Sequence, residues 1–457
     1  MSEPLTVREL YCPSHFGNTY EVVQEDEMRE LLADARDWGF NRFSDWFDTI
    51  DLYDVYGAGH QHFNLPEAMW ARKFENFTIA ADLGLELGLV ITPNHVFANQ
   101  VTPENAAVKG DLVFGQLVCP SKAGGTELIL ANYRNLFQDF AARGLRLRAI
   151  AACPYDYGGC ACDACRPWIV AFGRLFQAIA KLAGEFFGPV EANLIGWWWS
   201  DADHRDFTAW ADREAPGAFH AMIHHLPYGE TAYAARPVPC GCRERAFVHI
   251  GYGTQAGDGD CYGHYGPVIA PGRVAQTVRN LFAQKAEGFM AYSEGAFDDL
   301  NKALLGGLAS GQFSTADEVL AAYARKHLGG DAAGWAAWLA EMGTFAVIDV
   351  VRARQGFDRL RRQEARPSWR LEQLECRLIM AEADAAVRGR TAWDAAALRA
   401  AETFWSAKQR LYRQVWRLGL PRHICALDRE SPAWNKEYQE LKGRRRASPE
   451  VNRRRQD

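Results

Sequence analysis

Several features that would place this sequence in familiar classes of protein are missing. The first residues, MSEPLTVREL, contain neither the basic region nor the apolar stretch of a signal peptide. No segment approaches the roughly 18–20 consecutive apolar residues that a membrane-spanning helix needs. We therefore expect a cytoplasmic protein without a membrane partner.

An excess of basic charge is missing as well. Lysine and arginine number 51 against 57 aspartates and glutamates, so the formal net charge is −6 and the isoelectric point is near 6.1. This balance argues against nucleic acid as a partner. The one basic block, residues 441–457, is expected to be a solvated, disordered tail. Whether the chain forms a homo-oligomer is left open by the sequence.

Internal repeats and low-complexity linkers are also absent, and short apolar runs alternate with amphipathic helices through the first 305 residues. This alternation is typical of a parallel α/β fold. The expected strands cover residues 8–12, 40–47, 86–91, 145–151, 191–197, 218–223, 246–250 and 288–292. A chain of 457 residues suits a barrel of about 250–300 residues with a second unit. We therefore predict a TIM (β/α)8 barrel in residues 1–305.

The strand pattern stops near residue 300. Residues 317–440 are rich in alanine, leucine, arginine and glutamate with helical periodicity, interrupted at 329–330, at 366–367 and at Pro421. This composition predicts an all-α domain in residues 306–440, between the barrel and the basic tail.

Carboxylates follow several of the expected strands, at the end of a barrel that usually holds its chemistry. Glu294 follows the last strand within YSEGAF, and Asp156 follows the fourth within PYDYGG. The fourth and eighth strands face each other across a barrel, so this pair suits the wide separation of an inverting glycosidase. Asp201 and Asp203, after the fifth strand, compete with Asp156 for its role. The ordinary alternative for any of these acids is capping a helix.

Aromatic and histidine side chains accompany these acids. Tryptophan rings stack on the apolar faces of sugars, and strand alternation would put Trp197 and Trp199 on one face. The alternative for each of these two rings is that it packs inside the barrel and contacts no sugar. Histidines gather at the expected strand ends, where we expect bonds to sugar hydroxyls, because no metal-binding HxH or HExxH element lies on an expected helix. The predicted substrate contacts are Asp45, His95, Tyr155, Trp197, Trp199, His204, His224, Tyr252 and Tyr292.

Cysteines form a second group of candidate ligands. Cys160, Cys162 and Cys165 lie directly after Asp156, and Cys242 lies in a later loop. In a cytoplasmic chain such thiols are candidates for a tetrahedral structural zinc, with free thiols as the alternative. A closed site of four cysteines would stiffen the loop that carries Asp156. No cofactor would be required for catalysis.

Two of these stretches also carry a family resemblance. The sequence DYGGCACDACRPW at 156–168 and YSEGAFDDLNKAL at 292–304 resemble glycoside-hydrolase-type barrels, including uncharacterised bacterial proteins. These are related at a distance to the family-20 β-N-acetylhexosaminidases and the family-67 α-glucuronidases. The resemblance implies a barrel followed by a helical domain. Family-20 enzymes have an adjacent Asp-Glu pair after the fourth strand, whereas Tyr157 follows Asp156 here, so that pair is not carried over.

The resulting hypothesis is a glycosidase that removes terminal sugars from short oligosaccharides or glycosides. Long loops at 48–66, 93–126 and 227–245 favour action at chain ends. Glu294 would be the general acid, and Asp156 or Asp201 would activate water. Two alternatives remain: a metal-dependent lyase or isomerase acting on a sugar acid, and a non-catalytic carbohydrate-binding barrel.

Overall fold

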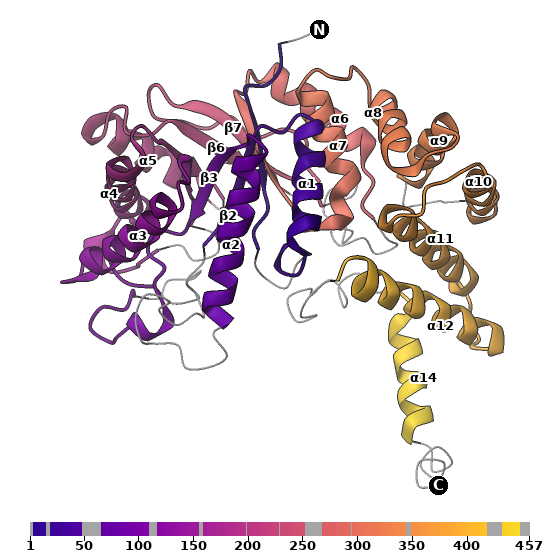
Figure 1. The fold of residues 1–457 in the computed structure, drawn as a ribbon. Helices are drawn as coiled ribbons and strands as arrows, with labels where there is room; N and C mark the ends of the chain where they lie inside the picture. The colour runs from indigo at the N-terminus through magenta and orange to yellow at the C-terminus, as the bar shows by residue number, and fades with distance from the viewer. Residues whose placement is uncertain are drawn as a thin grey trace.

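Eight parallel strands close into a barrel in the computed structural model (Figure 1). The structure describes residues 3–14, 19–47, 65–108, 117–154, 159–197, 199–227, 229–251, 267–293, 295–343, 349–417 and 432–447. The strands, each paired with its neighbours in chain order, are β1 (Val7–Tyr11), β2 (Arg42–Trp46), β3 (Glu86–Ile91), β4 (Leu147–Ala152), β5 (Glu191–Ile195), β6 (Ala221–His225), β7 (Arg243–His249) and β8 (Gly288–Tyr292). Pairing of β1 with β8 closes the barrel, so β4 lies opposite β8.

Helices surround the strands and continue beyond them. Those that belong to the barrel are α1 (Glu25–Asp37), α2 (Leu65–Asp82), α3 (Gly125–Ala142), α4 (Trp168–Phe187), α5 (Asp201–Glu214), α6 (Pro271–Ala283) and α7 (Asp299–Ala309). The C-terminal helices are α8 (Ala316–Tyr323), α9 (Ala332–Met342), α10 (Val350–Arg362), α11 (Trp369–Val387), α12 (Ala395–Arg410) and α14 (Asn435–Ala447). Among the described residues, no helix combines the length and apolar character required to cross a membrane.

Local sequence explains where the barrel helices begin and how they pack. Helix α5 starts after Ser200, whose hydroxyl accepts a hydrogen bond from the Asp203 backbone. Helix α4 turns an apolar face inward that includes Phe172, Phe176 and Ile179, all buried. The main core therefore lies between the strands and their surrounding helices, as in other (β/α)8 barrels.

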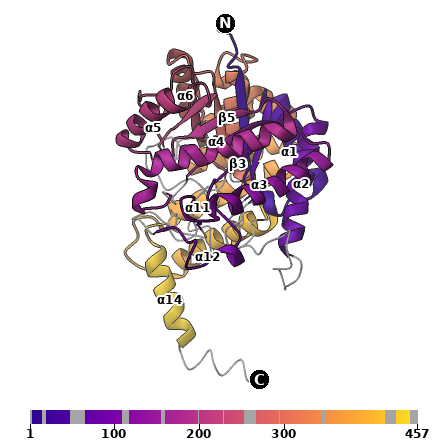
Figure 2. The same cartoon turned by 90° about the vertical axis from the view of Figure 1, so that its left-hand side faces the viewer.

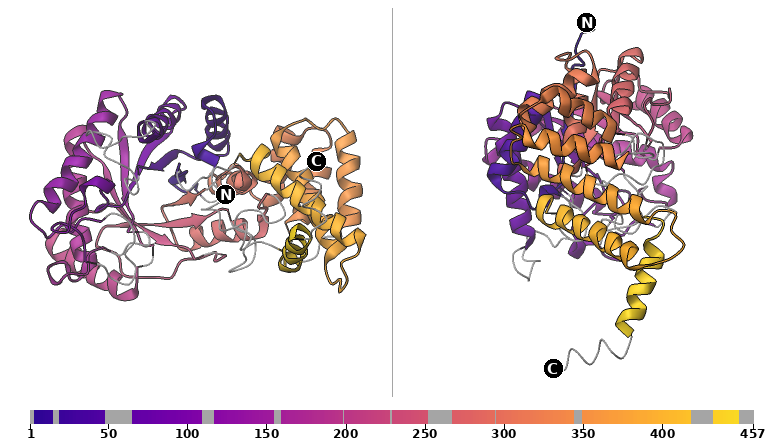
Figure 3. Two further views of the ribbon diagram at one scale, coloured as in Figure 1. Left: turned by 90° about the horizontal axis from the view of Figure 1, so that it is seen from below. Right: turned by 90° about the vertical axis from the view of Figure 1, so that its right-hand side faces the viewer.

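The C-terminal helices lie to one side of the barrel, and α14 extends away from them (Figures 2 and 3). Arg370 of α11 crosses to the barrel, where it bonds to Asp34 of α1 (2.6 Å) and Asp299 of α7 (2.8 Å). The Phe297 ring, just after β8, packs 5.3 Å from the ring of Trp416. The helical region thus braces the carboxyl end of β8.

The predicted fold class is confirmed: a TIM barrel precedes a helical C-terminal region. Strand β6 runs from Ala221 to His225, two to three residues later than expected. The predicted domain boundary at residue 305 falls inside α7, so the exact division stays a prediction. The expected disorder of 441–457 is wrong for residues 441–447, which belong to α14; residues 448–457 lie outside the described part.

Candidate functional site

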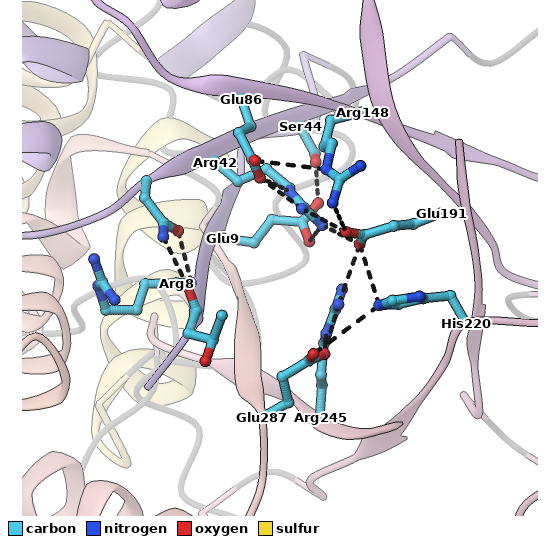
Figure 4. Close-up of polar contacts among 12 residues, drawn as sticks. Arg8, Glu9, Arg42, Ser44, Glu86, Arg148, Glu191, His220, Arg245 and Glu287 are labelled. Atoms are coloured by element: carbon cyan, nitrogen blue, oxygen red, sulfur yellow. Dashed lines mark hydrogen bonds and ion pairs between the residues drawn. The ribbon is translucent and has the colours of Figure 1, made fainter. Parts of the chain in front are cut away.

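Charged side chains, three of them buried, gather at the amino end of the barrel strands in the described part of the chain. Arg42 bonds to Glu86 at 2.6 Å and to Glu191 at 2.9 Å, while Arg245 bonds to Glu191 at 3.1 Å and to Glu287 at 2.7 Å. We call these five residues the amino-end ion network. Figure 4 shows Glu191 between the two guanidinium groups. Three of the five are the first residues of their strands, which fixes the network at that end.

The amino-end ion network holds its charges fixed. Burial alone would raise the pKa of Glu191, but hydrogen bonds and charge from Arg42, with the charge of Arg245, lower it to about 2. Glu191 is therefore ionised over the physiological range. The active sites of (β/α)8 enzymes lie at the opposite end of the strands. We therefore interpret this network as stabilising the fold.

Among the residues that the structure describes, aromatic and imidazole rings line the carboxyl end of the lumen. Trp197 follows β5 and packs 4.3 Å from the His225 ring and 4.9 Å from the His249 ring, centroid to centroid. Phe247 and Tyr292 complete this group, with Tyr292 lying 5.5 Å from His249 and 5.6 Å from Phe247. We call these five residues the aromatic–histidine layer. Tyr11 of β1 extends it, 5.6 Å from Tyr292.

The two histidines of this layer face each other through their Nε2 atoms, which lie 3.2 Å apart. Burial lowers the pKa of His225 to about 4, and the positive charge of Arg236 acts in the same direction. Burial also lowers the pKa of His249 well below its usual range. Both rings are therefore neutral at pH 7, when each carries one N–H donor and one acceptor nitrogen.

A buried polar group supports the chain on both sides of residue 294. The Ser293 hydroxyl lies 2.5 Å from the Tyr20 hydroxyl and donates to Asp298 at 3.0 Å. Lys302 pairs with Asp298 at 2.6 Å and donates to the Gly295 carbonyl at 2.9 Å. Burial raises the pKa of Asp298, although the Lys302 charge opposes the effect. The residues flanking Glu294 are thus held by bonds to Asp298, to Lys302 of α7 and to Tyr20 in the segment after β1.

Four predicted site residues lie outside the described residues: Glu294, Asp156, Tyr155 and Tyr252. Their roles stay predictions. The remaining predicted residues can be placed individually.

The predicted acids that are described hold structural positions. Asp203 accepts from the Ser200 backbone at 2.8 Å and from its hydroxyl at 2.6 Å, so it caps α5. Asp201, mostly exposed, pairs with Arg236 at 3.0 Å. Asp45 is fully buried, and Lys73 of α2 lies 3.2 Å from its carboxylate.

The placement of Asp45 differs from the predicted substrate contact. Its carboxylate accepts from the Ser14 backbone and hydroxyl, both at 2.9 Å. Strand alternation explains the difference, because Trp46 turns into the lumen and Asp45 turns outward to α2. Asp45 therefore fastens the segment after β1 to the barrel wall.

Trp197 and Trp199 do not share a face, which corrects the prediction. Strand β5 ends at Ile195, so the two-residue alternation does not continue to position 199. Trp197 joins the aromatic–histidine layer, whereas Trp199 packs 6.4 Å from Phe172 and 5.1 Å from Phe207, between α4 and α5.

His204 and His224 also lie outside the lumen. His204 packs against Trp199 at 5.1 Å. His224 bonds through Nε2 to Glu244 at 2.9 Å and stacks on Tyr233 at 4.5 Å. The lumen-facing histidine is its neighbour His225, because β6 extends through residue 225.

Two further predicted contacts can be placed near the lumen. His95 is buried, with its ring 6.2 Å from Trp46, and Tyr292 belongs to the aromatic–histidine layer. Alternate residues of a strand point to the same face. Because Ile223 and Phe247 face the lumen, His225 and His249 are expected to face it too.

Four cysteines meet beside the β3 and β4 ends of the barrel. The sulfur atoms of Cys119, Cys160, Cys162 and Cys165 all lie within 4.8 Å of one another and could hold a metal ion. The prediction of Cys242 as the fourth ligand is wrong, because Cys119 fills that place. The Cys242 thiol donates to the Phe219 carbonyl at 3.3 Å, before β7 and thus at the opposite end of the barrel.

A surface hollow of about 430 Å³ lies elsewhere, between α6, α7 and residues 311–317. Its lining contains Arg279 and Asp317 but no residue from the carboxyl end of a strand. We therefore place the candidate site at the aromatic–histidine layer, where the strands of a (β/α)8 barrel present their chemistry.

Solved structures of glycoside hydrolases align with this chain. A family GH115 4-O-methyl-α-glucuronidase with specificity for decorated arabinogalactans aligns at a TM-score of 0.55 and 11% identity, over 94% of this chain and 62% of that chain. A GH138 enzyme targeting pectin rhamnogalacturonan II aligns at 0.43 and 9% identity, over 94% and 62%. The catalytic domain of a Paenibacillus polymyxa β-amylase aligns at 0.41 and 8% identity, over 67% and 98%.

The alignment with the GH115 glucuronidase covers nearly the whole chain, including the helical region. Because only 11% of the aligned residues are identical, it shows a shared fold and no more. This confirms the resemblance to glycoside-hydrolase-type barrels at the level of architecture. The chain spans 62% of the length of that glucuronidase. No protein-family model and no curated protein matches the sequence.

Proposed function

We propose that this protein is a glycoside hydrolase that removes terminal sugars from short oligosaccharides or glycosides. The observation that carries the proposal is the aromatic–histidine layer at the carboxyl end of a closed barrel. Trp197 and Tyr292 offer aromatic surface for the apolar face of a sugar ring. His225 and His249, whose Nε2 atoms lie 3.2 Å apart, are neutral imidazoles, a type of group that hydrogen-bonds to sugar hydroxyls.

Two carboxyl groups would perform the reaction. Glu294 is assigned as general acid: it gives its proton to the glycosidic oxygen as the bond to the anomeric carbon breaks. Asp156 is assigned as general base: it takes a proton from the water that attacks that carbon. The opposite positions of β4 and β8 in the barrel support this pairing, since an inverting pair is separated by about 6.5–9.5 Å.

The alternatives to Asp156 are weakened by their surroundings. The Asp203 carboxylate caps α5, and Asp201 is paired with Arg236. Neither carboxylate is part of the aromatic–histidine layer. The proposed chemistry needs no cofactor, so a metal among the four cysteines would have a structural role.

A screen of the purified protein against aryl hexosaminides, glucosides, galactosides, xylosides, arabinosides and uronides tests the proposal. Release from one class that survives chelation, and that falls by about 10²–10⁴ in Asp156→Asn but not in Asp201→Asn, is the expected result. Activity that chelation removes and a divalent metal restores would favour the lyase or isomerase. No release, together with sugar binding by calorimetry, would favour the non-catalytic barrel.

A further inference from the structure

The four cysteines near β3 and β4 come from two separate loops. Cys119 lies between β3 and α3, while Cys160, Cys162 and Cys165 lie between β4 and α4. Because β3 and β4 are paired neighbours, their following loops leave the same edge of the barrel side by side. The protein therefore brings together thiols that are 41 residues apart in sequence.

The sulfur separations match a tetrahedral zinc site. With Zn–S bonds of about 2.3 Å, two ligands of a tetrahedron lie about 3.8 Å apart. Cys119 Sγ is 3.8 Å from Cys162 Sγ and 3.6 Å from Cys165 Sγ, and all pairs lie within 4.8 Å. A disulfide would require about 2.05 Å, so these are separated thiols.

The surroundings suit anionic sulfur ligands. The Val108 backbone N–H donates to Cys160 Sγ at 3.3 Å, and the Ser121 hydroxyl lies 3.1 Å from Cys165 Sγ. Such contacts stabilise thiolates and orient metal ligands. Three of the four thiols are buried, and Cys162 is half-buried, so a bound ion would be shielded while keeping one path of entry.

We infer that Cys119, Cys160, Cys162 and Cys165 bind one zinc ion in a closed, structural site that ties the loop after β3 to the loop after β4. Four sulfur ligands leave no open position for water or substrate. As the ion binds, four Zn–S bonds form and the thiol protons leave to solvent.

This tie has a consequence for the candidate active site. In the sequence, Asp156 lies between β4 and the first of the three clustered ligands, Cys160. Backbone bonds already join the two loops, since the Ala161 N–H donates to the Val108 carbonyl at 3.0 Å. Zinc would fix the far end of the short segment that carries Asp156. The inference does not rest on the protein being a glycosidase.

The test compares two matched substitutions, Cys119→Ser and Cys242→Ser. Elemental analysis of protein from zinc-supplemented cells should give about one zinc per chain for the wild type and for Cys242→Ser, and about a tenth of that for Cys119→Ser. The thermal midpoint should fall on chelation in the wild type and in Cys242→Ser. Equal zinc content in both variants, or a zinc-free wild type, would overturn the inference.

A second measurement covers the case in which Cys119→Ser does not fold. Wild-type protein exchanged with Co²⁺ should show the intense sulfur-to-cobalt charge-transfer and visible bands of a tetrahedral tetrathiolate. A weak octahedral spectrum, bound iron in the purified protein, or disulfides found by thiol titration would each contradict the zinc assignment. None of these readouts depends on hydrolytic activity, so this inference and the proposed function can fail separately.

Discussion

The two ends of the barrel fill the space between the strands with different kinds of side chain. At the amino end, Arg42 and Arg245 converge on Glu191, and the side chains of all three are at most 7% exposed. At the carboxyl end, Trp197, His225 and other rings fill the lumen without an ion pair among them in the part of the chain that the structure describes. One end binds its charges to each other, and the other offers unionised polar atoms on an aromatic surface.

On the proposed assignment of the active site, the density of charge does not mark the active end of this barrel. In the amino-end ion network Arg42, Glu191 and Arg245 are buried, and each of the five charges has a partner of opposite sign. A matched pair in a rigid framework has little capacity to bind a ligand. The aromatic–histidine layer carries neutral polar groups instead, since His225 and His249 are both uncharged at pH 7.

The largest stability effect should come from breaking the amino-end ion network. Glu191→Gln leaves Arg42 and Arg245 buried with less compensation, so the free energy of unfolding should fall by about 3–5 kcal/mol in urea titrations. The matched control is Glu185→Gln, which removes an exposed ion pair with Arg134 and should cost at most about 1 kcal/mol. Equal losses would remove the distinction between buried and exposed pairs.

Two tryptophan substitutions distinguish substrate binding in the lumen from packing between helices. Trp197→Leu should raise KM for the best substrate by about two- to tenfold, because it removes an aromatic contact of roughly 0.5–1.5 kcal/mol. Trp199→Leu should lower the unfolding free energy but leave KM of the folded enzyme unchanged, since that ring packs between α4 and α5. The reverse outcome would place the sugar outside the lumen.

The two ends should also lose stability in different pH ranges. The folded pKa of His225, about 4, lies below the usual value of 6.5, so its contribution is lost as pH falls from 6.5 towards 4. Glu191, with a folded pKa of about 2, contributes above pH 4.5 and loses that contribution as pH falls towards 2.

Urea titrations at several pH values would separate these ranges. Between pH 6.5 and 5, His225→Gln should reduce the fall in unfolding free energy by about 1.5 kcal/mol relative to wild type. Glu191→Gln should leave the slope unchanged in that interval. A steeper slope in His225→Gln would mean that the imidazole is charged in the folded protein.

The smallest effect is expected at a predicted catalytic acid that caps a helix instead. Asp203→Asn should lower stability by no more than about 1 kcal/mol and leave kcat/KM within twofold. Asp206→Asn, on the exposed face of the same helix, is the control. A hundredfold loss of activity confined to Asp203→Asn would return that residue to the catalytic site.

Sequence periodicity was sufficient for the fold because eight apolar runs alternate with amphipathic helices. It was insufficient where the expected end of a strand differs from the observed end. With β6 expected to end at residue 223, His224 was predicted as a substrate contact. The strand continues to His225, and that residue faces the lumen. The same limit affected Trp199, because alternation ends with β5 at Ile195.

Contacts between loops were the second limit. The spacing of Cys160, Cys162 and Cys165 predicts a metal site, but the fourth cysteine of the group, Cys119, becomes a neighbour only through the pairing of β3 with β4. Cys242 precedes its strand, so it belongs to the other end of the barrel. Knowing which end of a strand each loop leaves would have excluded it.

The most direct test of the central claim, that catalysis belongs to the carboxyl end, compares Glu294→Gln with Glu191→Gln. kcat/KM per folded molecule is measured on the best aryl glycoside. The account predicts a fall of about 10²–10⁴ for Glu294→Gln and a change within about twofold for Glu191→Gln. Full activity in Glu294→Gln, or an equal loss in Glu191→Gln, would contradict it.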